Sequence, residues 1–202
     1  MNDTKGYTLV EILAAMFISL VLLLAVYTAV NSVQKSSGGI ERKVTAQQDV
    51  RPALDLMAME IRMASYNPTF TDGIWRNAGT CGAGANQSYR GIQEATASSL
   101  TVEMDIDGSG TVGAPHSNEI ISYAYDAAVA NQYITRSTNC GGAQPFLGDT
   151  VASGHPRTVR VINDAATPVF RYYDGSGNVI AAASLPAAIP NIRTIEITLV
   201  VE

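Results

Sequence analysis

The sequence has little charge and no cluster of basic residues. Of its 202 residues 15% are charged, and the net charge at pH 7 is −5. A protein that binds nucleic acid concentrates lysine and arginine on its binding face. Nucleic acid is therefore not expected as a main ligand of this chain.

Motifs of catalysis and of structural zinc are also missing. The two cysteines, Cys81 and Cys140, form no Cys-x-x-Cys pair, and no histidine–cysteine cluster has zinc spacing. Neither G-x-S-x-G nor a phosphate-binding loop occurs in the sequence. An enzymatic role, such as that of a membrane-anchored hydrolase, therefore has no support, and the expected function requires no cofactor.

The N-terminal region contains no proline before Pro52 and almost no charge. Glu11 is the single charged residue between Lys5 and Lys35. This apolar stretch exceeds the roughly 20 residues that a helix needs to cross a bilayer. A carboxylate inside such a stretch is costly, which indicates a function and a need for a cationic partner.

Cleavage of the chain after Gly6 would create that partner. Tyr7 would then carry a new amino group, and Glu11 would lie four residues further on, about one helical turn away on the same face. The two groups could neutralise each other within one chain. Between stacked chains, the same pairing would set the register of an otherwise apolar bundle.

Lys5-Gly6, followed by Tyr7-Thr8-Leu9-Val10-Glu11, resembles the processing site of type IV prepilins and type II secretion pseudopilins. The resemblance implies that a prepilin peptidase cuts after Gly6 and methylates the amino group of Tyr7. It also implies that Glu11 directs assembly with other pilins into a filament. Tyr7 departs mildly from the family, which usually has phenylalanine at this position.

The same resemblance implies a location and further partners. The chain is expected as a single-pass protein of the inner membrane, with its C-terminal domain outside the cytoplasm, and later in a pilus or pseudopilus. The assembly platform of the inner membrane is then a further partner. Lys5, which precedes the span, is consistent with a cytoplasmic leader.

A secretory signal or a plain signal anchor fits the N-terminus less well. A secretory signal has an apolar core of about 7–15 residues followed by a small-residue cleavage site. Here the core is longer, and residues 25–29 match that cleavage site poorly. A plain signal anchor accounts for the hydrophobicity but for neither Gly6 nor Glu11.

A second resemblance concerns the subgroup. Residues 54–57, 62–66 and 172–175 are similar to the PilW minor pilins and the related GspJ pseudopilins. This implies a minor pilin in a priming or tip complex, beside other minor pilins and a tip adhesin. The alternatives are a major pilin or type II secretion pseudopilin and, in a different class, a membrane-anchored calcium-binding or adhesive module that does not polymerise.

The order of the hydrophobic patterns predicts an α+β fold, in which one long helix precedes an antiparallel β-sheet. We expect a leader over 1–6, a helix over 7–64 and a β-rich extracytoplasmic domain over 65–202. Residues 7–34 of the helix would lie in the membrane or the filament core, and residues 40–64 would pack on the domain. Strands are expected at 99–106, 119–125, 132–136, 159–162, 169–173, 179–182 and 193–202.

Details of the helix and of the last strand follow from the same patterns. The pair Gly38-Gly39 and Pro52 are points where the helix could bend or be interrupted. An apolar stripe should face the domain, and charged residues such as Glu60 should occupy the remaining surface. The stripe consists of Val50, Leu54, Met57, Ile61 and Ala64. The strand over 193–202 is apolar enough to be well covered.

Cys81 and Cys140 are expected to pair if the domain is exported across the membrane. The bridge would close a loop of about 60 residues, which is worth roughly 4 kcal/mol in the chain-entropy model. Two free buried thiols are the alternative. The long loop over 69–98, joined by this bridge to 137–156, would present a binding face.

A metal site is the remaining expectation. Asp105, Asp107 and Ser109, followed by Gly110, match positions 1, 3, 5 and 6 of an EF-hand calcium loop. Position 12 is His116, which supplies no bidentate carboxylate, so Glu119 would replace it in a differently shaped loop. A polar turn between two strands is the alternative. A second acidic stretch, at 174–178, is explained by a hairpin turn.

Overall fold

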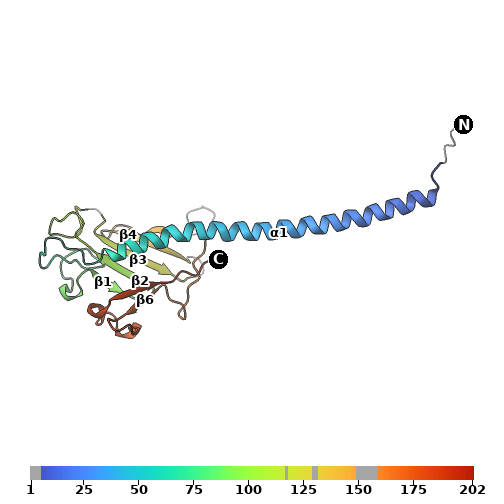
Figure 1. The fold of residues 1–202 in the computed structure, drawn as a ribbon. Coiled ribbons are helices and arrows are strands. Elements are labelled where there is room, and N and C mark those ends of the chain that lie inside the picture. Colours follow the sequence, from blue (N-terminus) through green and yellow to red (C-terminus); the bar gives the residue numbers. More distant parts are fainter. Residues whose placement is uncertain (1–5, 117, 129–131, 149–158) are drawn as a thin grey trace. The chain divides into compact units, whose positions relative to one another are not determined.

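The computed structural model describes residues 6–116, 118–128, 132–148 and 159–202 (Figure 1). The chain divides into two compact units, one that ends at Val44 and one that spans Thr45–Glu202. The expected leader over 1–6 lies outside the described residues except for Gly6.

The helix α1 spans Leu9–Arg62. It continues through Gly38 and Pro52, so the interruptions predicted at these points are absent. A proline inside a helix removes one hydrogen bond to the preceding turn. The residues that follow Pro52 offset this loss because Ala53 and Met57 are buried in the core of the second unit.

The second unit contains a five-stranded antiparallel sheet in the order β1-β2-β3-β4-β5. The predicted strands over 99–106, 119–125 and 132–136 correspond to β2, β3 and β4. The strands β1 and β5 lie in stretches expected to be loops, which corrects that expectation. The five strands are β1 (Ile92–Ala95), β2 (Ser99–Glu103), β3 (Ile120–Asp126), β4 (Tyr133–Thr138) and β5 (Gln144–Leu147).

A two-stranded antiparallel sheet pairs β6 (Phe170–Tyr173) with β7 (Thr194–Ile197). The strand predicted over 193–202 is shorter than expected, because only the single bridge Val161–Val201 follows β7. Of the strand predicted over 159–162, the same bridge is the only β-pairing among the described residues. The strand expected over 179–182 is wrong: Val179 makes one bridge to Tyr173, and a 3-10 helix, Ala182–Ser184, follows.

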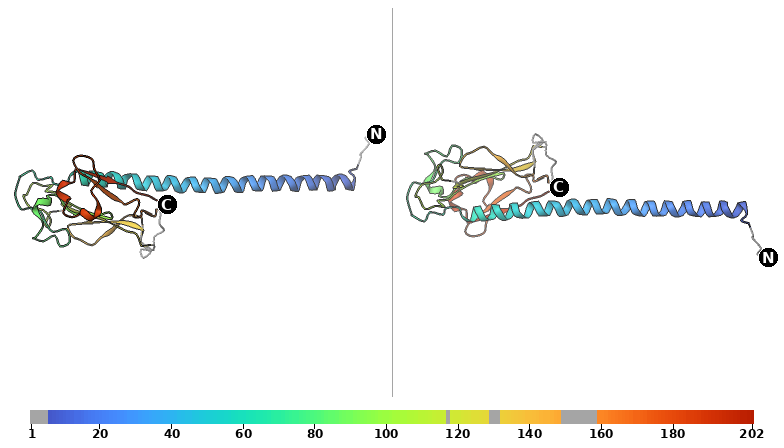
Figure 2. Two further views of the ribbon diagram at one scale, coloured as in Figure 1. Left: turned by 90° about the horizontal axis from the view of Figure 1, so that it is seen from below. Right: turned by 90° about the horizontal axis from the view of Figure 1, so that it is seen from above.

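The core of the second unit lies between the C-terminal part of α1 and the two sheets (Figure 2). Four of the five residues of the predicted stripe lie in or against this core, with Met57 fully buried, whereas Leu54 is not part of it. The C-terminal strand was expected to be well covered. Its apolar residues from Ile195 to Val201 are only partly buried, because β7 lies in the small sheet. The buried apolar residues of the larger sheet include Leu100, Val102, Tyr123 and Ile134.

Glu60 is buried, although its charge predicted a place on the surface. Its side chain lies on the face of α1 that also carries Ala53 and Met57. Arg136 of β4 donates to both carboxylate oxygens, with Nη2 2.6 Å from Oε1 and Nε 3.1 Å from Oε2. The hydroxyl of Tyr123 on β3 donates to the same Oε2. A bidentate ion pair therefore attaches the helix to the sheet.

Candidate functional site

The first turn of α1 is built around Thr8 and Glu11. The carboxylate Oε2 of Glu11 accepts hydrogen bonds from the backbone N–H of Thr8 at 2.8 Å and from its hydroxyl at 2.9 Å. The N–H of Glu11 donates in return to the Thr8 hydroxyl oxygen at 3.3 Å. This reciprocal arrangement is a capping box, which explains why the helix begins here.

The residues before this turn are open to solvent. Gly6 and Tyr7 are exposed and lie outside the helix, and Tyr7 has 84% of its surface accessible. A side chain added at Gly6 would meet nothing within 4 Å. The peptide bond between the two residues therefore lies in an exposed segment outside the helix, where proteolytic cleavage is favoured. Lys5, which precedes them, lies outside the described residues.

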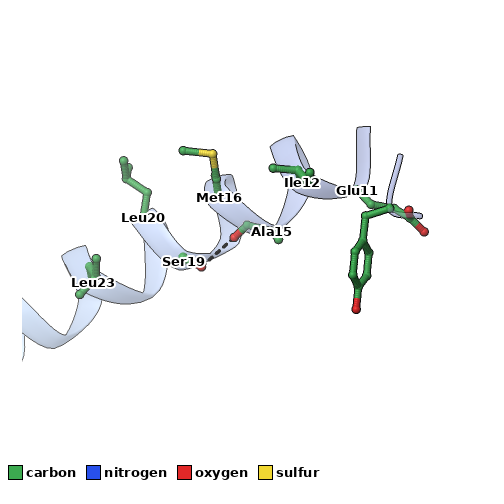
Figure 3. Close-up of a pocket in the computed structure, with 8 residues that line it drawn as sticks. Glu11, Ile12, Ala15, Met16, Ser19, Leu20 and Leu23 are labelled. Carbon is green, nitrogen blue, oxygen red and sulfur yellow. Dashed lines mark hydrogen bonds between the residues drawn. The ribbon is translucent and has the colours of Figure 1, made fainter. Parts of the chain in front are cut away.

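From Ile12 to Val30 the helix is mostly apolar and carries no charge. Figure 3 shows Glu11 at the start of one face and Leu23 toward its other end. Ser19 adds little polarity, because its hydroxyl donates to the carbonyl of Ala15 at 2.7 Å. Every large apolar side chain from Tyr7 to Val33 is exposed. The segment is long and apolar enough to span a membrane.

Residues 1–27 match the family model described as the prokaryotic N-terminal methylation motif. The chain carries a prepilin-type N-terminus. The matched stretch contains Gly6, Tyr7 and Glu11 and supports a type IV pilin-like protein that a prepilin peptidase processes. Neither the curated proteins nor the solved structures gave a match.

The methylation motif, residues 1–27, bears on several expectations from the sequence. Together with the exposed apolar helix it fits anchoring in the inner membrane before assembly into a pilus. The motif belongs to a structural family rather than to a class of catalysts, which favours a role in assembly.

Cys81 and Cys140 form a disulfide, with a sequence separation of 59, and no free cysteine remains among the described residues. The bond joins the segment after α1 to the turn between β4 and β5. That segment is held further by Trp75, which packs with Ile74, Val112 and Ile120. The expected binding face over 69–98 and 137–156 therefore includes ordered elements, while residues 149–158 lie outside the described part of the chain.

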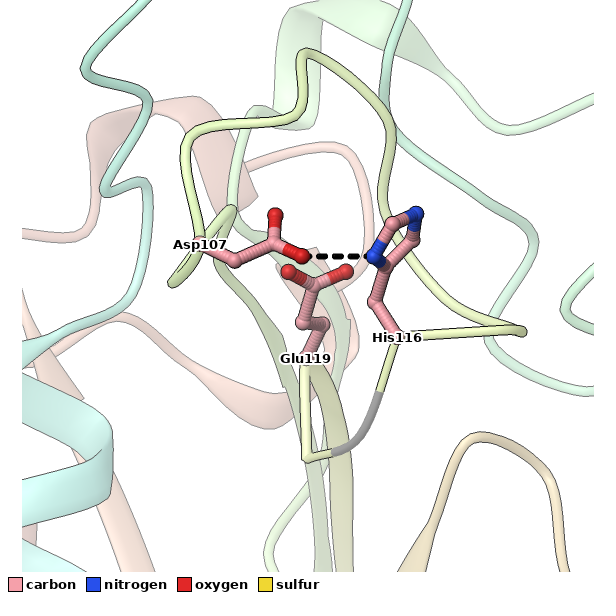
Figure 4. Close-up of side chains that lie close together, drawn as sticks. All are labelled: Asp107, His116 and Glu119. Carbon is pink, nitrogen blue, oxygen red and sulfur yellow. Dashed lines mark hydrogen bonds and ion pairs between the residues drawn. The ribbon is translucent and has the colours of Figure 1, made fainter.

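The acidic loop between β2 and β3 brings Asp107, His116 and Glu119 together (Figure 4). One ligand atom of each side chain lies within 4.8 Å of the others. Asp107 Oδ2 is 2.6 Å from His116 Nδ1. Glu119 is buried, and its two oxygens accept from the N–H groups of Ile106 at 3.2 Å and Gly113 at 3.1 Å.

The other two residues of the predicted calcium loop have structural partners. Asp105 is fully buried, and its oxygens accept from the N–H groups of Ser109 at 3.0 Å and Gly110 at 2.9 Å. The hydroxyl of Ser109 donates to the carbonyl of Thr111 at 3.1 Å. These bonds are typical of a polar turn, so the convergent group contains two of the four predicted residues, with His116 added.

The two carboxyl groups of this convergent group differ electrostatically. Hydrogen bonds from Ser109, together with the neighbouring His116, lower the pKa of Asp107. Burial raises the pKa of Glu119, and the negative charge of Asp107 adds to that rise. Asp107, His116 and Glu119 could hold a divalent cation, because carboxylate oxygens suit calcium and an imidazole suits zinc.

Sequence reasoning set His116 aside because it cannot supply the carboxylate of an EF-hand. Its position before a buried acid of the same loop is the signal that could have identified it. The second acidic stretch is a turn, as expected: Asp174 Oδ1 accepts from the N–H groups of Ser176 at 2.8 Å and Asn178 at 2.9 Å.

Proposed function

We propose that this chain is a minor type IV pilin-like subunit of a priming or tip complex. A prepilin peptidase cuts it after Gly6 and methylates Tyr7. The apolar helix then leaves the inner membrane for the core of a filament, where Glu11 pairs with the amino group of a neighbouring subunit. In the membrane the C-terminal domain lies outside the cytoplasm, and the assembly platform and other minor pilins are the partners.

One observation carries this proposal: Glu11 is the only charged residue between Lys5 and Lys35, in a segment whose large apolar side chains are all exposed from Tyr7 to Val33. Such a surface needs a membrane or other apolar helices to cover it. Its carboxylate needs a cation, and an N-terminal amine one turn away on the processed chain supplies one in each copy.

Mass spectrometry of the N-terminal peptide tests processing. We expect a peptide that begins at N-methylated Tyr7 in both the membrane fraction and the sheared surface fraction. Glu11→Ala should keep the processed peptide in the membrane and remove the subunit from the surface fraction. An intact Met1 in cells with an active prepilin peptidase would overturn the proposal.

The place in the filament rests on the resemblance of residues 54–57, 62–66 and 172–175 to minor pilins. A tip subunit is expected to be scarce in purified filaments, far below the subunit of the shaft. Abundance equal to that of the shaft would instead identify a major pilin. Assembly that depends on a type II secretion system would identify a pseudopilin.

We also propose that the acidic loop binds a divalent cation, with calcium as the ion expected from the sequence. The convergence of Asp107, His116 and Glu119 within 4.8 Å supports this second function. Titration calorimetry on residues 45–202 should give saturable calcium binding that Asp107→Asn removes. Asp174→Asn, a matched change in a hairpin turn, should leave it intact.

Two outcomes would contradict calcium binding. If calcium gives no saturable heat, the acidic loop is a polar turn. If zinc binds instead and His116→Gln removes its binding, the loop takes a transition metal, and the calcium prediction is wrong. If the protein binds calcium and the Glu11→Ala variant functions normally, the protein is a membrane-anchored module that does not polymerise.

A further inference from the structure

The two oxygens of the Glu11 carboxylate are used unequally. Oε2 accepts both hydrogen bonds from Thr8, at 2.8 Å from the N–H and 2.9 Å from the hydroxyl. Oε1 accepts none from the residues that the structure describes. The hydroxyl of Thr8 has two roles, because it donates to this carboxylate and accepts from the N–H of Glu11 at 3.3 Å.

We infer that Thr8 is a positioning residue for the carboxylate of Glu11, the group that acts in assembly. The two hydrogen bonds from Thr8 hold Oε2 at the start of α1. Oε1 is left to accept a hydrogen bond from the amino group of another copy of the chain. The inference rests on the proposed function of Glu11. Thr8 itself does not contact the partner chain; it holds the Glu11 carboxylate, which does.

The physical reason is the apolar setting of Glu11. A carboxylate in an apolar segment is costly unless hydrogen-bond donors surround it. Before assembly Thr8 supplies two such donors from the same chain, and they offset part of the cost of holding Glu11 in the span. During assembly the amine can approach the second oxygen while the capping box stays formed, which keeps the helix start intact.

The chemistry restricts which residues can replace Thr8. Serine offers the same hydroxyl donor and acceptor. Valine has a similar shape and lacks the hydroxyl. Aspartate can accept from the N–H of Glu11 and thus cap the helix, but its side chain offers no donor to the carboxylate and repels it. If Thr8 only capped the helix, aspartate would substitute for it as well as serine does.

The test compares full-length variants in cells that make filaments. Mass spectrometry gives the processed Tyr7 peptide in the membrane, and the ratio of surface to membrane subunit gives assembly. Thr8→Val should be processed and inserted as the wild type is, with a ratio about tenfold lower, the size expected for one hydrogen bond to a charged group. Thr8→Ser should restore assembly, and Thr8→Asp should not.

Thr28→Val is the matched control. Thr28 lies in the same apolar segment, and its hydroxyl donates to the carbonyl of Ala25 at 2.9 Å, so this change should leave the ratio unchanged. Wild-type assembly by Thr8→Val, or restoration by Thr8→Asp, would overturn the inference alone. Failure of Thr8→Val to be processed would also overturn it, because Thr8 would then act in peptidase recognition. A wild-type chain absent from filaments would overturn the proposed function as well.

Discussion

Glu103 is an acidic residue in the interior of the second unit. Its side chain is fully buried on β2, and Oε2 accepts the N–H of Arg76 at 2.8 Å. Oε1 is buried without a hydrogen-bond partner in the part of the chain that the structure describes. Burial raises the pKa of Glu103 to about 8, against the smaller opposing effects of the Arg76 N–H and charge. The folded domain therefore holds this carboxyl group protonated at neutral pH.

We expect the stability of the second unit to fall between pH 4.5 and about 8. In this window the folded state keeps a proton on Glu103 that the unfolded chain has released, so each rise in pH favours unfolding. The loss should amount to a few kcal/mol, and it should be complete above about pH 8. Glu103→Gln should flatten this part of the profile and stabilise the domain at pH 8.

Urea unfolding of residues 45–202 at pH 5 and pH 8 measures this effect. The matched control is Asp72→Asn, which removes an exposed carboxylate from the same region and should leave the slope unchanged. Equal pH dependence in the wild type and Glu103→Gln would show that Glu103 ionises in the fold as it does in water.

The acidic loop shows which part of a candidate metal site can be predicted from the sequence. Asp107 and Glu119 were predicted as ligands from their spacing. Their approach to His116 depends on the folding of the whole loop, because the two partners of the Asp107–His116 ion pair are nine positions apart in the sequence. Spacing identified the acids, and only the tertiary fold selected which of them converge.

Among the elements, those with strong local patterns were predicted and those defined by pairing were not. The alternation of Leu100 and Val102 predicted β2 because these side chains face the core. The strands β1 and β5 lie at the two edges of the larger sheet. Pro145, in β5, argues against a strand by itself, and an edge position tolerates it because one side of the strand has no partner strand in that sheet.

The contact between α1 and the sheet was predicted as an apolar stripe, but its polar centre was missed. Glu60 lies three residues after Met57, at a spacing that continues the buried face. A charged residue at such a position is exposed unless it finds a partner, and the partner, Arg136, lies far along the chain. The position of Glu60 in the stripe was the available signal.

Glu60→Ala should destabilise the second unit by about 3–5 kcal/mol, because Arg136 and Tyr123 would lose their common acceptor while remaining partly or fully buried. Tyr123→Phe removes one hydrogen bond to a charged group and should cost about 1.5–3 kcal/mol. Urea midpoints of residues 45–202 measure both changes. Asp55→Ala, at an exposed position on the same helix, is the control. A loss for Glu60→Ala no larger than that of the control would mean that the ion pair contributes nothing to the attachment of the helix.

At the scale of the whole molecule, the two units differ in how they bury apolar surface. The unit that spans Thr45–Glu202 has its own core, formed by α1 and both sheets, and a disulfide closes within it. The unit that ends at Val44 exposes its large apolar side chains. The unit that spans Thr45–Glu202 therefore buries apolar surface within itself, whereas the unit that ends at Val44 needs an apolar environment to cover its surface.

A chain reduced to residues 45–202 and exported by a cleavable signal should therefore be soluble, monomeric and disulfide-bonded. The truncation keeps Ala53 and Met57, so the helix still contributes to the core. Size-exclusion chromatography and thiol labelling check this outcome, and a fusion that restores residues 1–44 should return the protein to the membrane fraction. Aggregation of the truncated chain, or its recovery with membranes, would contradict the division into an anchoring unit and an independent domain.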